Sequence, residues 1–124
     1  MTTSRTFKLG DRSITLEAGG IAQRAHGAAL VRSGDAVVLV TVVVSDDPRD
    51  DVDFFPLTVE YREKAAAAAR IPGGFARREL RLSDHEVLVS RLIDRSIRPL
   101  FPKRFTHEVL VQASHRHVYD HAVR

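Results

Sequence analysis

The sequence contains no cysteine among its 124 residues. This absence excludes disulfide bonds, thiolate metal sites, iron–sulfur clusters and a cysteine nucleophile, and it fits a reducing compartment. The longest apolar run, from Ala36 to Val44, is about half as long as the roughly 18 residues that span a bilayer. The first five residues also lack the apolar stretch of a signal peptide. We therefore expect a cytoplasmic protein with no membrane partner.

The excess of positive charge is local, since it is concentrated in one part of the chain. The net charge is +3, yet residues 70–104 carry nine Lys/Arg against four Asp/Glu, and eight of the nine are arginine. A solvated, salt-bridged surface is one interpretation of such a region. The planar guanidinium suits phosphate and base stacking better than an ammonium does, so the arginine bias and the neighbouring glycines favour a polyanion site.

Alternating apolar residues and turn signals predict a sheet. The expected strands are two short ones within residues 5–17 around Gly10-Asp11, then 21–26, 28–32, 36–44, 54–63 and one beginning at 109–112. The 36–44 segment is apolar on both faces, which is typical of a strand that is covered on both sides. Together these patterns predict an α+β fold with a mixed or antiparallel sheet from residues 5–64 and 108–113.

One helix is predicted to pack on a face of this sheet. Ser83 and Glu86 form a capping-box pattern, and Pro99 predicts an end at about Arg98. The helix carries two patterns along its length. An apolar stripe consists of Leu88, Leu92, Val89, Ile93 and Ile97, and a basic side consists of Arg91, Arg95 and Arg98.

Two other segments raise the question of a metal. Five aspartates lie between Asp46 and Asp53, but they lack the ligand spacing of a calcium loop, so we expect a solvated loop. In residues 114–124, His117 and His121 have helical i,i+4 spacing. The segment is terminal and short, so a frayed tail is favoured over a metal site. We expect no catalytic residue and no metal ligand in this chain.

Several motifs resemble those of the polynucleotide phosphorylase (polyribonucleotide nucleotidyltransferase) family. They are the segments 20–22, 34–41, 53–64, 70–75 and 90–102, and they occur in the order in which the family has them. The resemblance covers about residues 5–113 and corresponds to the front part of the first RNase PH-like domain. It therefore implies a truncated domain over residues 1–113, followed by an unmatched His-rich tail at 114–124.

The resemblance implies a function in RNA processing and mRNA degradation. The family degrades RNA from the 3′ end with phosphate and Mg²⁺, releases nucleoside diphosphates, and threads the strand through a ring-shaped homotrimer. It implies an RNA-binding constriction loop at Phe75, Arg77 and Arg78, with further RNA contacts at Arg81, Arg91, Arg95 and Arg98. The sequence departs from the family at Ala76, Leu80, Leu82 and Ser96. The first of these departures removes one aromatic stacking platform.

The family's phosphate and metal sites lie in a second RNase PH-like domain that this sequence does not include. We therefore expect the isolated chain to bind no cofactor and to lack phosphorolytic activity. Three alternatives stay open: a non-catalytic single-stranded RNA-binding module, free or docked on a full-length homologue; an inactive truncated or frameshifted gene product; and a structural domain whose arginines pair with a protein partner.

Overall fold

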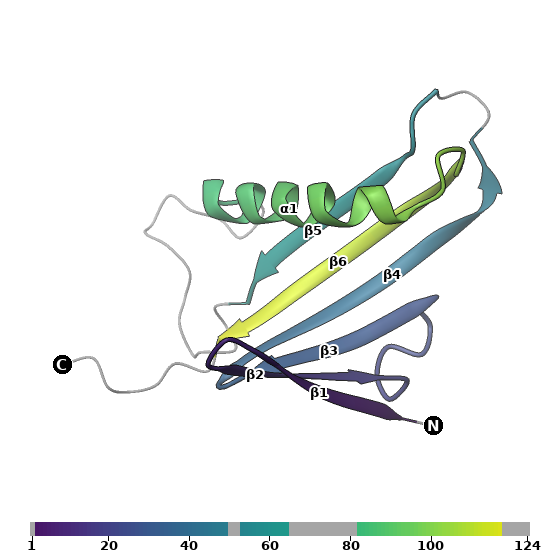
Figure 1. Ribbon diagram of the computed structural model, residues 1–124. Helices are drawn as coiled ribbons and strands as arrows, with labels where there is room; N and C mark the ends of the chain where they lie inside the picture. The colour runs from purple at the N-terminus through teal and green to yellow at the C-terminus, as the bar shows by residue number, and fades with distance from the viewer. Residues whose placement is uncertain (1, 50–52, 65–81, 118–124) are drawn as a thin grey trace.

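The computed structural model describes residues 2–49, 53–64 and 82–117 (Figure 1). They form a six-stranded sheet in the order β1-β2-β3-β4-β6-β5, with one α-helix and a short 3₁₀ helix. The elements are β1 (Thr3–Leu9), β2 (Arg12–Ala18), β3 (Gly27–Ser33), β4 (Ala36–Pro48), β5 (Leu57–Glu63), α1 (Asp84–Ile97), η2 (Arg98–Leu100) and β6 (His107–His117). The predicted α+β class with a mixed sheet and one main helix is confirmed.

The strand connections explain why the sheet is mixed. The first four strands follow one another as antiparallel neighbours, and β6 adds antiparallel to β4. Gly10 and Gly34 lie in the β1–β2 and β3–β4 turns with φ of 60° and 58°, a conformation that costs glycine little. Strand β5 pairs parallel with β6, and α1 lies between them in the chain. This is the crossover connection that parallel strands require.

The core lies where α1 and η2 cover the β5–β6 end of the sheet. Val109 is completely buried, and Leu57 and Val111 are buried beside it. Three phenylalanines close one end of this core, with ring centroids 4.6 Å apart between Phe55 and Phe101 and 5.6 Å apart between Phe55 and Phe105. These are normal distances for stabilising aromatic pairs.

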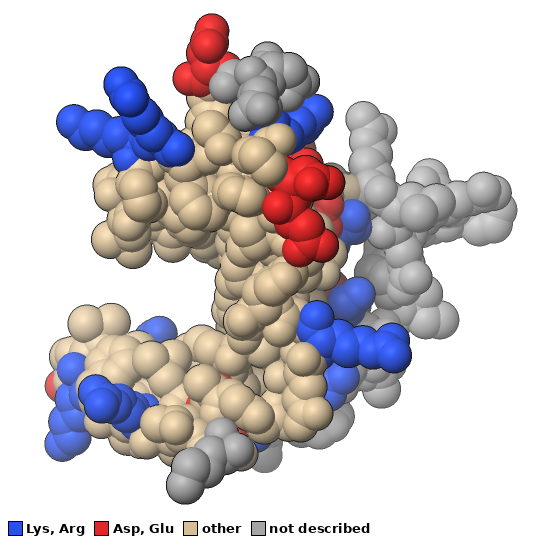
Figure 2. Space-filling model, turned by 90° about the vertical axis from the view of Figure 1, so that its right-hand side faces the viewer, with Lys and Arg blue, Asp and Glu red and all other residues tan. Residues whose placement is uncertain are grey.

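The sequence-based expectation of a strand buried on both faces is wrong for β4. Its residues from Ala36 to Val42 are only half-buried, and Val43 is 43% exposed. Within the described part of the chain, α1 contacts β5 and leaves β1–β4 without a covering helix. Figure 2 accordingly shows two lobes that flank a hollow lined mostly by uncharged residues.

Three further predictions about strands need correction. Residues 21–26 form turns and bends, because Ala22 has φ of 52° and its carbonyl accepts the amide of Ala25 at 2.9 Å. Strand β5 begins at Leu57 and not at residue 54, because Pro56 has no amide to donate to a ladder. Strand β4 continues to Pro48, through the first residues of the expected acidic loop.

The expected boundary at residue 113 also differs from the structure. Strand β6 continues to His117, and its residues 114–117 pair with residues 36–39 of β4. The prediction of a frayed segment is therefore wrong for these four residues, because the long β4 provides them with ladder partners. The rest of the predicted tail, including His121, lies outside the described residues.

No helix in the described ranges combines the length and the apolar character needed to cross a membrane.

Candidate functional site

Helix α1 carries the described part of the predicted site, and its start is determined by local hydrogen bonds. The Glu86 amide donates to Ser83 Oγ at 3.2 Å, and the Ser83 amide donates to Glu86 Oε2 at 2.8 Å. This reciprocal pair is the capping box that the sequence predicts. Asp84 and Glu86 also place negative charge in the first turn, where the helix dipole favours it.

Polar side chains of α1 satisfy the free edge of β5. The Tyr61 amide donates to Ser90 Oγ at 2.9 Å, and the Glu63 amide donates to Glu86 Oε1 at 2.9 Å. The Ser90 hydroxyl in turn donates to the Glu86 carbonyl at 2.8 Å. Edge amides of β5 that would otherwise be available to another strand are thus paired with the helix.

Arg98 completes this docking at the other end of the helix. Its guanidinium binds Asp94 with two hydrogen bonds, Nε to Oδ1 at 2.9 Å and a terminal nitrogen to Oδ2 at 3.0 Å. It also donates to the carbonyls of Phe55 at 3.0 Å and Leu57 at 3.5 Å, and it lies 5.6 Å from the centre of the Phe55 ring. These contacts give Arg98 a structural role in addition to the RNA-binding role predicted for it.

Arg91 and Arg95 differ from Arg98 because they point away from the sheet. Both are exposed, and neither forms an ion pair with another described residue. Leu88 and Leu92 lie on the same outer side and are 65% and 64% exposed. We call these four residues the outer strip of α1.

The single apolar stripe predicted for this helix is therefore divided in the structure. Val89, Ile93 and Ile97 are half-buried, and Ile97 packs against the core. Leu88 and Leu92 are instead in the outer strip with the arginines. Edge docking explains the division, because it turns the line of Glu86, Ser90 and Arg98 toward β5.

A chain of polar contacts joins the end of β5 to β6 and α1. Tyr61 Oη lies 2.9 Å from His115 Nδ1 and 3.3 Å from Glu63 Oε1, and that carboxylate oxygen lies 3.4 Å from His85 Nε2. Burial, reinforced by the negative charges of Glu63 and Glu86, raises the pKa of Tyr61 to about 12. The phenol therefore remains protonated at neutral pH.

The pKa of Glu86 is lowered by the same docking geometry. Burial alone acts to raise the pKa of this carboxyl. The amides of Glu63 and Ser83, the Ser83 hydroxyl and the charge of Arg62 outweigh the burial effect. A charged Glu86 thus contributes to holding α1 on β5.

The predicted loop residues Phe75, Arg77, Arg78 and Arg81 lie outside the described residues. The edge-docking residues were not predicted from the sequence, although Glu86, Ser90, Asp94 and Arg98 recur at intervals of four. That spacing places them in one line along a helix, and it is the signal that could have revealed them.

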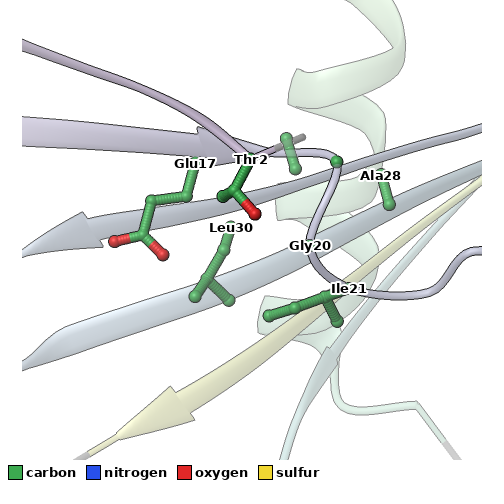
Figure 3. Close-up of a pocket in the computed structure, with 8 residues that line it drawn as sticks. Thr2, Glu17, Gly20, Ile21, Ala28 and Leu30 are labelled. Atoms are coloured by element: carbon green, nitrogen blue, oxygen red, sulfur yellow. The ribbon is translucent and has the colours of Figure 1, made fainter.

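A pocket near the N-terminal strands offers no second site. It lies between β2, β3 and the turn at Gly20, where Thr2, Ile21 and Leu30 contribute to its walls (Figure 3). Its volume of about 20 Å³ accommodates little more than one water molecule.

Comparison with known proteins agrees with the fold and the motifs. The sequence model of the 3′ exoribonuclease family, domain 1, also called RNase PH, matches residues 10–119. The polyribonucleotide nucleotidyltransferase of Solibacter usitatus is 61% identical over 105 residues, which are 85% of this chain and 15% of that protein. The corresponding enzyme of Amoebophilus asiaticus is 54% identical over 109 residues, which are 87% of this chain and 15% of that protein.

The extent of these matches is as informative as their identity. The chain spans about 15% of the length of the curated relatives it matches. The family match begins in the β1–β2 turn and continues beyond the end of β6, so it includes α1 with its outer strip. With this match, and with a mixed sheet and helix of the predicted RNase PH-like type, the chain belongs to the 3′ exoribonuclease family and carries sequence of its domain 1.

Proposed function

We propose that this chain binds single-stranded RNA as the RNA-gripping part of a 3′-to-5′ phosphorolytic exoribonuclease. The observation that carries the proposal is the outer strip of α1, where Arg91 and Arg95 are exposed without an ionic partner among the described residues. The segment that precedes α1 contributes Phe75, Arg77 and Arg78 to the same interface. Family membership supports the choice of RNA as the polyanion.

The proposed interface combines charge with stacking. Like charges at i,i+4 on a helix destabilise it by a few tenths of a kcal/mol, and phosphates bound at Arg91 and at Arg95 relieve that cost. Arg77 and Arg78 neutralise further phosphates, and Phe75 stacks on a base. In this proposal Arg81 supplies a further cation for RNA, and Arg98 contributes to RNA binding while it also holds α1 against β5.

In this proposal the reaction itself needs parts of the longer relatives. The reaction consumes RNA and phosphate, requires Mg²⁺ and releases nucleoside diphosphates. Among the described residues, no three His, Asp or Glu side chains are arranged to share a metal ion, so no Mg²⁺ site is assigned to them. The chain acts in mRNA degradation in the cytoplasm, as part of a homotrimer or docked on a full-length homologue.

Salt dependence of RNA binding tests the outer strip. If three to four phosphates are contacted, the slope of log Kd against log salt should be about 2 to 3, at roughly 0.7 per phosphate. Replacing Arg91 and Arg95 with alanine should reduce this slope by about 1.4 units on the same basis. The matched control, Lys103→Ala with Arg104→Ala, removes two exposed cations from the loop after η2 and should change the slope much less.

The loop residues are tested with the same oligo(A) titration. Arg77→Ala with Arg78→Ala should reduce the slope by about 1 to 1.5 units. Phe75→Ala should weaken binding by about 1–3 kcal/mol at nearly constant slope, because stacking releases no counterions. Ala76→Phe, which restores the family's second aromatic residue, should tighten binding. Folded variants that bind as the parent does would favour the structural alternative, in which the arginines pair with a protein.

Activity is tested separately from binding. The isolated chain, incubated with poly(A), phosphate and Mg²⁺, should release no ADP above background. Release that chelation abolishes would reveal a catalytic site in this chain. Sequencing downstream of codon 113 distinguishes a frameshifted gene product from a part of the full enzyme.

A further inference from the structure

The two edges of the sheet differ in what pairs with their outer amides. At the β5 edge, Ser90 and Glu86 of α1 accept amides of the strand. At the other edge, β1 pairs with β2 over seven residue pairs, and none of the described strands lies on its outer side (Figure 1). All seven residues of β1 are exposed, and no other described element packs closely against it. Such an edge presents a row of amides and carbonyls to a further strand.

The charge of β1 indicates which kind of strand fits. The strand carries Arg5 and Lys8 and no carboxylate, and Arg12 faces it from β2. The acids in the connecting turn and on β2 are Asp11 and Glu17, and Glu17 already lies 3.5 Å from Arg32. Blue side chains project from the lobe that these strands form in Figure 2. An incoming strand with carboxylates opposite Arg5 and Lys8 would gain favourable cross-strand pairs.

Strand β1 also exposes large apolar side chains. Phe7 and Leu9 are 44% and 66% exposed, and side chains alternate along a strand, so both lie on the face that also carries Arg5. Leu16 of β2 is opposite Arg5 on this face and is 37% exposed. A partner strand that places aliphatic residues beside Phe7 and Leu9 would cover part of this surface.

We propose that the β1 edge binds an extended acidic peptide segment by strand addition, with carboxylates opposite Arg5 and Lys8 and aliphatic residues opposite Phe7 and Leu9. This function goes beyond RNA binding and uses residues distant in sequence from the outer strip of α1. A second copy of the chain is a poorer occupant, because β1–β1 pairing would bring two Arg5 and two Lys8 together without a carboxylate on either strand.

The test uses a synthetic probe, acetyl-Val-Glu-Val-Thr-Glu-Thr-Thr-amide, whose glutamates lie opposite Lys8 and Arg5 in antiparallel pairing. An NMR titration should shift the amides of β1 and β2 and slow hydrogen exchange along β1. The variant Arg5→Glu with Lys8→Glu should weaken binding of this peptide by about fivefold or more, and it should gain binding of a version with lysines in place of both glutamates. Lys103→Glu with Arg104→Glu is the matched control and should bind the acidic probe as the parent does.

Backbone pairing is tested with two N-methylated versions of the probe. Only alternate amides of an added strand point toward its neighbour, so methylation of the even amides and of the odd amides should have unequal effects. Equal binding by both versions, shifts centred outside β1 and β2, or unchanged binding after charge reversal would overturn the proposal. So would concentration-dependent self-association through β1. An RNA-binding measurement on the same variants distinguishes this outcome from failure of the proposed RNA interface.

Discussion

The β5 and β1 edges belong to one sheet but depend on different parts of the chain. The β5 edge is held by hydrogen bonds to Glu86, Ser90 and Arg98, which follow it by more than twenty residues. The β1 edge depends on its hairpin with β2 and lies far from the buried core at Val109. One edge is thus integrated into the core, and the other is charged and open.

This difference shows two ways in which a protein can protect the outer edge of a sheet from unwanted pairing. A helix side chain can take the place of a missing neighbour, which protects the edge and also orients the helix. Here that orientation determines which arginines of α1 face outward. Cationic side chains on an open edge discourage pairing with identical strands and leave room for a complementary one.

Breaking the covered edge should have the largest effect. Glu86→Ala removes the acceptor of the Glu63 amide together with one half of the capping box, so we expect a loss of about 2–3 kcal/mol in the free energy of unfolding. Urea denaturation measures it. Glu86→Gln retains an acceptor oxygen and should recover part of the loss, whereas equal losses in both variants would contradict the hydrogen-bonding explanation.

A second change at the same edge should be smaller. Ser90→Ala leaves the Tyr61 amide without its acceptor and should cost about 1–2 kcal/mol. Ser96→Ala is the matched control, because the exposed Ser96 hydroxyl donates to the Leu92 carbonyl of its own helix and to no other described residue. Its stability should remain within about 0.5 kcal/mol of the parent. Similar costs for the two substitutions would exclude edge docking as the cause.

Acid should weaken the covered edge by a smaller, graded amount. The folded-state pKa of Glu86 is lowered, so its contribution is present above its ordinary pKa of 4.5 and is lost as the pH falls through the lower folded value. Unfolding free energies measured from pH 6 to pH 3 should therefore decline more steeply in the parent than in Glu86→Gln. Parallel curves would indicate that this carboxyl does not couple to folding.

The open edge should respond least to substitution. Phe7→Ala removes a side chain that is already 44% exposed, so we expect a loss of less than about 1 kcal/mol. Hydrogen exchange provides a second measurement, since amides of β1 should open at lower free energy than those of β6 beside the core. A loss comparable to that of Glu86→Ala would mean that β1 is integrated into the core after all.

Much of the fold was predictable because its signals are local. The Gly10 and Gly34 turns, the capping box at Ser83 and the end of α1 depend on residues within a few positions of one another. The length of β6 was not predictable in this way, because residues 114–117 are held by β4 residues far back in the chain. The strand expected at 21–26 failed for a different reason, since these residues form a local turn in which the Ala22 carbonyl accepts the Ala25 amide.

The candidate site shows the same difference between local signals and long-range contacts. Sequence alone determined the family, the helix and the presence of three arginines on it, because motifs and i,i+4 spacing are properties of the chain. Tertiary structure decided that Arg98 binds Asp94 and the β5 carbonyls while Arg91 and Arg95 face outward. The physical reason is that an edge amide buried without an acceptor destabilises the folded state, whereas an arginine that stays in solvent does not. The polar line of α1 therefore packs against β5, and the outer strip faces solvent.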